Sequence, residues 1–256
     1  MADGTPVCCQ TVAHPFPASA PGTRYPGPAH KEGNRQNDGA MSDTFSIRRA
    51  TAEDMRVIIG MIDEASAWLA TKGTDQWARP WPSKIARDAR VWRGINSRST
   101  WIAEDQGEPV ATITYKQNGN QNLWTAGELR DPAVYACRLV VSRKWAGDEI
   151  GAALIDWAGY RALQAWKAQR IRIDVWTENT ALHRYYEKHR FEPVRICEFD
   201  APGSTPSAAL FQKPIAEVSE IAVTRFTDMT SRTSQRTVPA ASPSASAEPT
   251  TVAAAA

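Results

Sequence analysis

The stretch of the chain best suited to chemistry covers residues 137–166 and reads CRLVVSRKWAGDEIGAALIDWAGYRALQAW. The mostly apolar run Cys137 to Val141 predicts a buried strand. A helix is predicted to open near Gly147, because apolar residues then recur at the spacing of one helical face. A strand that turns sharply into a helix presents free backbone N–H groups at the positive end of the helix dipole. Arg143 and Lys144 add positive side chains. The stretch therefore predicts an anion site suited to phosphate.

Composition excludes several other functions. The net charge of +2, without a dense Lys/Arg tract, argues against a nucleic-acid-binding protein. No apolar run is long enough to span a membrane, and the N-terminus lacks a positive-then-apolar leader, so a cytoplasmic location is expected. The four cysteines are not spaced with histidines as zinc ligands would be, so they are interpreted as small hydrophobic residues and no metal is expected.

Three segments differ in composition along the chain. Residues 1–43 are rich in Pro, Gly, Ala, Asn and His without apolar periodicity, and are predicted to be a disordered extension. Met41 lies just before the first predicted strand and is an alternative start to Met1. Residues 216–256 are rich in Ser, Thr, Ala and Pro and are predicted to be a disordered tail. One folded domain is therefore expected at 44–215.

Within this domain the sequence predicts strands and helices in an α/β order. Thr51 to Asp54 give a helix-start signature after the first strand, and Gly107 marks a hairpin turn. The expected strands are 45–49, 100–104, 110–115, 137–141, 170–176, 191–199 and 208–213, and the expected helices are 55–72, 84–96, about 147–166 and 179–188, with a loop at 116–132. This order predicts a mixed, mostly antiparallel central sheet flanked by helices.

The strand-turn-helix stretch resembles the acetyl-CoA-binding motif of the GNAT family of N-acetyltransferases, whose turn usually reads Arg/Gln-x-x-Gly-x-Gly/Ala. The segment Ala146 to Gly151 fills that frame, with Ala146 and Glu149 as departures and Gly151 as the match. A second resemblance lies in the segment NTALHRYYEKHRF, where Asn179, Tyr186 and Phe191 fall in the register of the family. The first strand and helix cap also look like the start of the family's domain. The resemblance spans the whole predicted domain and implies an acyl-CoA N-acyltransferase-like fold.

The resemblance also implies roles for individual residues. The turn would hold the CoA pyrophosphate through residues Arg143, Lys144, Ala146, Gly147, Asp148, Glu149, Ile150, Gly151 and Ala152. The backbone of Leu139, Val140 and Val141 would pair with the pantetheine amides and polarise the thioester carbonyl. Asn179 is placed in the same acetyl-CoA site. Tyr186 is the candidate general acid for the departing thiolate, and its neighbour Tyr185 is the alternative.

The acceptor side is less defined. Trp77 and Trp81 lie in a loop braced by prolines and are candidates for contact with an amine substrate, although loop anchoring explains them equally well. The base that takes the amine proton is not assigned, because none of the candidates has a distinguishing pattern and a water chain could serve instead. Those candidates are Glu128, Asp131, Asp174, Glu178 and His183.

The resemblance implies an acetyl-CoA-dependent N-acetyltransferase that acts on an amine of a small molecule or a peptide. The alternative is a non-catalytic acyl-CoA-binding or regulatory module, motivated by the unusual turn. A P-loop-type nucleotide binder is disfavoured because no Gly-Lys-Ser/Thr follows the turn. The sequence does not fix a homodimer, which is common in such folds. Glu149 would place a negative charge beside the pyrophosphate, so replacing it with glycine is predicted to tighten acetyl-CoA binding.

Overall fold

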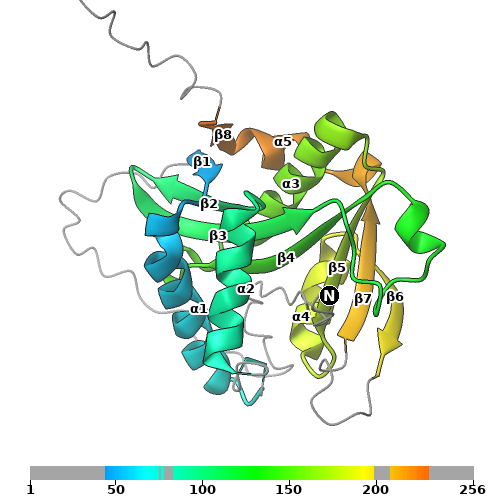
Figure 1. Ribbon diagram of the computed structural model, residues 1–256, viewed down its shortest axis with the longest axis horizontal. Helices are drawn as coiled ribbons and strands as arrows, with labels where there is room; N and C mark the ends of the chain where they lie inside the picture. The colour runs from blue at the N-terminus through cyan, green and yellow to red at the C-terminus, as the bar shows by residue number, and fades with distance from the viewer. Residues whose placement is uncertain (1–43, 75, 78–82, 199–207, 231–256) are drawn as a thin grey trace, which may run out of the picture.

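A computed structural model describes residues 44–74, 76–77, 83–198 and 208–230. They form an eight-stranded sheet in the order β6-β7-β5-β4-β3-β2-β1-β8 (Figure 1). The strands are β1 Phe45–Arg49, β2 Thr100–Asp105, β3 Glu108–Lys116, β4 Ala133–Val141, β5 Arg170–Trp176, β6 Glu192–Cys197, β7 Ala208–Pro214 and β8 Phe226–Asp228. The helices are α1 Met55–Ala70, α2 Lys84–Asn96, α3 Ile150–Trp166, α4 Thr180–Lys188 and α5 Glu220–Thr224.

The sheet is mixed and mostly antiparallel, as the sequence predicted. Only two of its seven strand pairs, β1 with β8 and β4 with β5, are parallel. Helices α1 and α2 cover one face of the sheet, and α3 lies against the other (Figure 1). The main apolar core joins the inner side of α3 to alternate residues of β3, β4 and β5. Gly159 permits this contact, because a Cβ there would lie 2.4 Å from Cδ1 of Ile171.

Local turn and cap chemistry follows the sequence closely. The backbone N–H of Thr51 donates to the carboxylate of Asp54 at 2.7 Å, which completes the predicted helix start. The hydroxyl of Ser83 accepts from Ala86 N–H at 3.2 Å at the start of α2. Gly107 adopts a φ of 88° in the β2–β3 hairpin, a conformation that glycine reaches without a steric penalty. The cap at Ser83 explains why the predicted bounds of α2 agree with the observed ones.

Strands β4 and β5 diverge in the middle of the sheet. Their parallel pairing covers Ala133–Tyr135 against Arg170–Arg172 and goes no further among the described residues. On its other edge, β4 shifts register against β3 between Thr112 and Thr114. Arg138 lies at this bulge with a φ of 47°. The second half of β4, which includes Leu139–Val141, therefore lies beyond the pairing of β4 with β5.

The folded domain continues beyond its expected end. A tail was predicted from residue 216, but residues 215–217 form a 3₁₀ turn, followed by α5 and β8. Strand β8 pairs in parallel with β1, and α5 packs on α3. The prediction was wrong for residues 216–230. The polar composition there conceals the buried Phe226, whose ring packs at a tilt against that of Phe45, with 5.9 Å between ring centroids. Residues 1–43 and 231–256 lie outside the described part.

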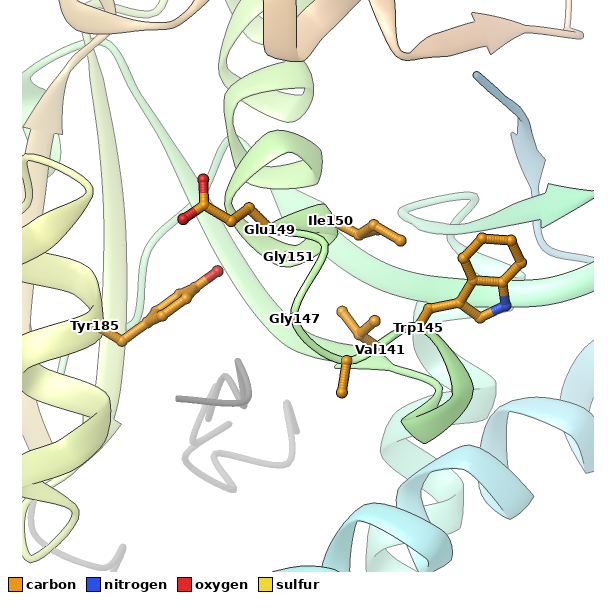
Figure 2. Close-up of a pocket in the computed structure, with 8 residues that line it drawn as sticks. Val141, Trp145, Gly147, Glu149, Ile150, Gly151 and Tyr185 are labelled. Atoms are coloured by element: carbon orange, nitrogen blue, oxygen red, sulfur yellow. The ribbon is translucent and has the colours of Figure 1, made fainter. Parts of the chain in front are cut away.

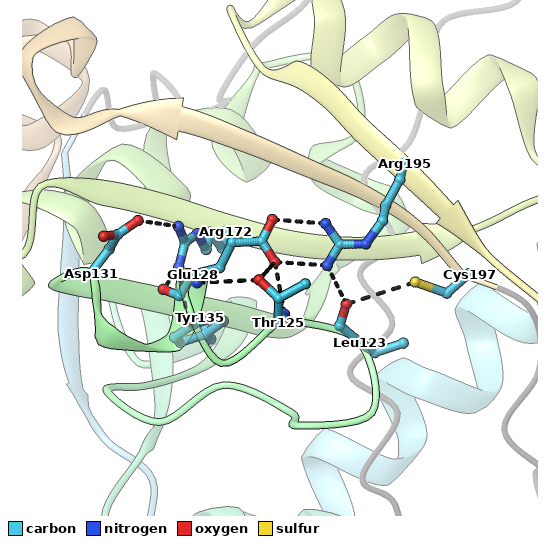
Figure 3. A network of polar contacts seen from close by, with 8 residues as sticks. All are labelled: Leu123, Thr125, Glu128, Asp131, Tyr135, Arg172, Arg195 and Cys197. Carbon is cyan, nitrogen blue, oxygen red and sulfur yellow. Dashed lines mark hydrogen bonds and ion pairs between the residues drawn. The ribbon is translucent and has the colours of Figure 1, made fainter.

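The connection between β3 and β4 is fastened to the sheet by ion pairs (Figure 3). Arg195 on β6 holds the carboxylate of Glu128 through two contacts of 2.7 Å. Arg172 on β5 is almost fully buried, and it contacts the carboxylate of Asp131 at 3.0 Å and the hydroxyl of Tyr135 at 3.0 Å. Two of the carboxylates considered as possible bases, Glu128 and Asp131, therefore serve as partners of arginines.

Replacing Glu128 with glutamine is expected to lower the free energy of unfolding by about 1 kcal/mol at pH 7. The hydrogen bond from Arg195 lowers the pKa of Glu128 to about 2 from 4.5. A depressed folded-state pKa stabilises the fold above the unfolded value, and this stabilisation is lost as the pH falls from about 5 to 2. The side chain is 23% exposed, so the expected energy is well below the full pKa difference.

Urea unfolding at pH 7 and at pH 3 measures this effect. The wild type and Glu128→Gln should differ at pH 7, and the difference should be clearly smaller at pH 3. Glu178→Gln, which removes an exposed carboxylate, is the matched control and should leave stability unchanged at both values. A loss that is equally large at pH 3 would contradict the ion-pair explanation.

Candidate active site

The turn between β4 and α3 forms the centre of the site. A 3₁₀ turn at Arg143–Trp145 follows β4, and α3 begins at Ile150. Gly147 has a φ of 108°, and Glu149 occupies the N-cap in a left-handed conformation with a φ of 53°. The first N–H groups of a helix have no acceptor within the helix, and the dipole makes this end positive. The turn thus presents the positive end of α3 as the sequence predicted, and the binding of an anion there stays a prediction.

A small pocket opens at this turn (Figure 2). Gly151 forms a tight part of its wall, because a Cβ there would lie 3.3 Å from the Tyr185 hydroxyl and 3.5 Å from side-chain carbons of Leu139 and Val141. The pocket is lined by Val141, Trp145, Ala146, Gly147, Glu149, Ile150, Gly151 and Tyr185. Six of these were expected from the sequence as cofactor-binding residues. Trp145 is an addition, and its membership follows from its place in the 3₁₀ turn.

The remaining predicted cofactor residues lie beside the pocket. Leu139 and Val140 are fully buried on β4, where only their backbone can face a ligand. Asp148 accepts a hydrogen bond at its carbonyl from Arg225, at 2.8 Å, so the extra C-terminal segment reaches the turn. Ala152 belongs to the first turn of α3 and faces the Tyr185 hydroxyl with its N–H. These residues surround the same strand end and helix start.

The two basic residues of the turn have partners outside the pocket. The guanidinium of Arg143 lies over the ring of Trp68, 4.2 Å from its centroid. Lys144 pairs with Glu108 at 2.5 Å in an exposed contact. Neither side chain lines the pocket, so the structure does not bring them to the anion site as expected. The first half of the turn directs the Arg143 side chain toward α1 and the Lys144 side chain toward β3. The spacing of residues in the sequence does not reveal these directions.

Lys188 is the cation that the structure adds to the turn. Its ammonium group contacts the carboxylate of Glu149 at 2.6 Å. This hydrogen bond lowers the pKa of Glu149, so the carboxylate is charged at neutral pH. Both side chains are about half exposed, and salt screens such a pair. The negative charge that Glu149 brings to the site is therefore offset in part by α4.

Replacing Glu149 with glycine is expected to tighten acetyl-CoA binding by about 3- to 10-fold. The change removes a negative charge from the anion site, releases Lys188, and places glycine where the backbone is left-handed. Glu149→Gln separates these causes, since it removes the charge and keeps a side chain in that conformation. Calorimetric titration with acetyl-CoA measures both dissociation constants. A constant unchanged by Glu149→Gly would show that the carboxylate does not face the ligand.

Two tyrosines of α4 occupy different environments. Tyr185 points its hydroxyl at the start of α3 (Figure 2), and burial raises its pKa. Tyr186 is fully buried, and its ring packs against Phe191 at 5.4 Å and Phe211 at 6.5 Å between centroids. Tyr185 thus contacts the pocket, while Tyr186 lies between α4 and the sheet. The role of Tyr186 as general acid stays a prediction.

Asn179 links α4 to the loop that contains Gln76 and Trp77. Its side-chain oxygen accepts from Leu182 N–H at 3.0 Å and so caps the helix, and its amide nitrogen donates to Oε1 of Gln76 at 2.5 Å. Sequence reasoning missed Gln76, which is fully buried. Trp77 beside it is half-buried and packs on the cluster between α1 and α2. Trp81 lies outside the described residues. Asn179 therefore serves the fold of the site, and a direct contact with a ligand stays a prediction.

The other base candidates also differ in their surroundings. His183 places Nε2 2.9 Å from the carbonyl oxygen of Trp176, so its ring is held by the backbone. Glu178 is exposed, and Asp174 is buried on β5. Of these three residues, Asp174 alone belongs to a strand of the sheet, and it lies just beyond the point where the pairing of β4 with β5 ends.

In the part of the chain that the structure describes, no helix is long and apolar enough to cross a membrane. No group of three or more His, Cys, Asp or Glu side chains in that part is arranged to hold a metal ion.

Comparison with known proteins identifies the family from the sequence and the fold from the structure. A family profile described as "Acetyltransferase (GNAT) family" matches residues 64–191, which is half of the chain. The uncharacterized N-acetyltransferase YesJ of Bacillus subtilis (strain 168) is 25% identical over 155 residues, which cover 59% of this chain and 84% of that protein.

Three solved structures share the fold. A GNAT-family acetyltransferase from Streptococcus agalactiae 2603 superposes with a TM-score of 0.54 at 16% identity, over 66% of this chain and 95% of that one. One from Listeria monocytogenes 4b F2365 gives 0.52 at 21% identity, over 66% and 94%. The aminoglycoside acetyltransferase AAC(6')-Ib, in complex with coenzyme A and kanamycin, gives 0.50 at 18% identity, over 68% and 96%.

Proposed function

Because the chain belongs to the acetyltransferase (GNAT) family and is an N-acetyltransferase, we propose that it takes the acetyl group from acetyl-CoA and transfers it directly to an amine of a small molecule or a peptide. The observation that carries the proposal is the junction of the second half of β4, which lies beyond the pairing with β5, with the start of α3. The coenzyme A bound to the structurally similar AAC(6')-Ib supports the choice of donor.

The residues present fit such a donor. The backbone of Leu139–Val141 lies beyond the pairing of β4 with β5 and suits the amides of a pantetheine chain. The helix start at Ile150 suits a pyrophosphate, and Gly151 leaves the space that a side chain would fill. A diphosphate brings its negative charge to the one end of α3 where the dipole is positive. Both ligand-holding parts lie at the same end of β4.

The chemistry then needs three contributions from the chain. A backbone N–H of β4 polarises the thioester carbonyl, so that the amine nitrogen attacks its carbon. The carbon–sulfur bond breaks, and Tyr186 gives its phenolic proton to the leaving thiolate. The amine loses a proton to a base or a water chain. No residue is assigned to that last step, since the candidate carboxylates Glu128 and Asp131 are bound to arginines.

The experiment is a titration of the full chain with acetyl-CoA, followed by measurement of CoA release in the presence of a panel of primary amines. Binding together with amine-dependent release is the expected result. Binding without release from any amine would favour the non-catalytic acyl-CoA-binding module. Absence of binding would show that Ala146 and Glu149 disable the turn. The cytoplasmic location and the homodimer remain predictions from the sequence.

A further inference from the structure

The face of the sheet that lies beneath α2 is polar where β3, β4 and β5 meet. Residues of β3 and β5 that contact the α3 core, such as Tyr115 and Ile173, alternate with residues that face the other way. Those opposite residues include Thr114, Lys116, Arg172 and Asp174. Thr114 and Thr100 share a buried hydrogen bond of 2.8 Å. The face of a sheet that a helix covers is normally apolar, so the polar residues on this face need an explanation.

Arg138 is a half-buried cation of this face. It lies at the β4 bulge and reaches under α2, where a Cβ on Gly94 would be 3.1 Å from its Nη2. Its Nη1 atom is buried and has no hydrogen-bond partner among the described residues. Arg172, which is almost fully buried in the same sheet, satisfies both terminal nitrogens with Asp131, Tyr135 and the Glu128 carbonyl. A buried guanidinium nitrogen that lacks a hydrogen bond is costly for the fold.

The charges around Arg138 add to this excess. Lys116 and the α2 residues Arg90 and Arg93 are its cationic neighbours, and Asp174 is the acidic one. Burial, together with Arg90 and Arg93, lowers the pKa of Arg138 to about 10, which still leaves it charged at pH 7. Burial and Arg138 likewise lower the pKa of Lys116. Four cations around one carboxylate make the region a site for an anion.

Arg138 and Asp174 also flank the place where the strands diverge. Pairing of β4 with β5 ends at Tyr135 and Arg172. Asp174 is two residues beyond Arg172 on the same face of β5, and Arg138 immediately precedes the Leu139–Val141 segment proposed to hold the donor. A ligand beneath α2 would therefore lie next to the reacting thioester.

We propose that the acceptor is an amine that also carries a carboxylate, an amino acid or a similar compound, and that Arg138 pairs with this carboxylate. The inference rests on the proposed function and names its substrate class. The planar guanidinium suits the two oxygens of a carboxylate. Asp174 attracts the ammonium form of the acceptor and disfavours a dianionic phosphate at the same place. Lys116 strengthens the positive field from β3.

The test measures CoA release by the full chain with the common α-amino acids and short ω-amino acids, each paired with its primary amide. We expect at least one acid to react with a kcat/KM about 10-fold or more above that of its amide. The amine of the amide is less basic than the amine of the acid, so a larger fraction of it is neutral. If amine reactivity alone set the rate, the amide would therefore react faster than the acid. An aminoalkyl phosphonate of matched length is expected to be a poorer acceptor than the acid.

Variants of Arg138 connect this preference to the structure. Arg138→Gln should raise the KM for the acid by about 10-fold and leave the amide unaffected, whereas Arg138→Lys should retain part of the preference. Acetyl-CoA binding by both variants shows that they are folded. Lys167→Asn, at an exposed left-handed position after α3, removes one positive charge elsewhere and should change nothing.

The outcomes separate the two proposals. CoA release that is equal for acids and amides, or a preference that survives in Arg138→Gln, would overturn the carboxylate assignment and leave the acetyltransferase standing. A phosphonate that reacts better than the acid would also overturn it. Release with no amine of any kind would overturn the proposed function, and this inference with it.

Discussion

Gly151→Asp is expected to weaken acetyl-CoA binding by about 100-fold, equivalent to ~2.7 kcal/mol. Two causes act together. The new Cβ would lie 3.3 Å from the Tyr185 hydroxyl and 3.5 Å from Leu139 and Val141, so the carboxylate must project into the pocket. There it places a negative charge where the pyrophosphate is expected to bind. Aspartate in the first turn of a helix is favourable for the helix itself, so the protein should remain folded.

Gly60→Asp provides the matched control. Gly60 lies in α1 with no atom within 4 Å of an added Cβ, and it is exposed. The same change of residue there should leave the dissociation constant for acetyl-CoA within about 2-fold, because a distant exposed charge is screened. Calorimetric titration of the wild type and both variants gives the three constants. Equal constants for wild type and Gly151→Asp would place the donor somewhere other than the start of α3.

Tyr186→Phe is expected to lower kcat by about 100-fold while the acetyl-CoA dissociation constant stays nearly constant. The hydroxyl is proposed to act only when the thiolate leaves, so its loss affects the transition state and not the bound donor. The ring itself is retained, and with it the packing against Phe191 and Phe211. Steady-state rates of CoA release, with binding measured in parallel, test this separation.

Tyr185→Phe distinguishes the two neighbouring tyrosines. Its hydroxyl faces the helix start and lines the pocket, so its loss should weaken donor binding a few-fold, by about 1 kcal/mol or less, and leave kcat almost unchanged. The reverse pattern, a large loss of kcat in Tyr185→Phe and little effect in Tyr186→Phe, would assign the proton donor to Tyr185. The register of the sequence motif would then have indicated the wrong member of the pair.

Much of the fold could be predicted because local signals agree with the tertiary structure. The alternating pattern of 170–176, the cap at Ser83 and the glycine of the β2–β3 hairpin each determine their own element. The strand-turn-helix centred on Gly147 also follows from local chemistry, since a buried strand and an amphipathic helix meet at a residue of positive φ. Six residues of the pocket were accessible to sequence reasoning for this reason.

The features that escaped prediction depend on contacts between distant parts of the chain. Lys188 reaches Glu149 from α4, and Gln76 reaches Asn179 across 103 positions of sequence. Arg143 and Lys144 leave the anion site because Trp68 and Glu108 attract them. Strand β8 forms because β1 offers an open edge, which composition does not show. Arg138 was not a candidate, since its importance arises from a bulge that places it beneath α2.

The most direct test of the proposed reaction follows the acetyl group itself. The full chain is incubated with acetyl-CoA labelled with carbon-13 in the acetyl group and with a mixture of amino acids and simple amines, and products are identified by mass. The expected result is a labelled N-acetyl product formed in equal amount to free CoA, and lost in Gly151→Asp. CoA release without any labelled amide product would contradict acetyl transfer to an amine and would identify the activity as thioester hydrolysis.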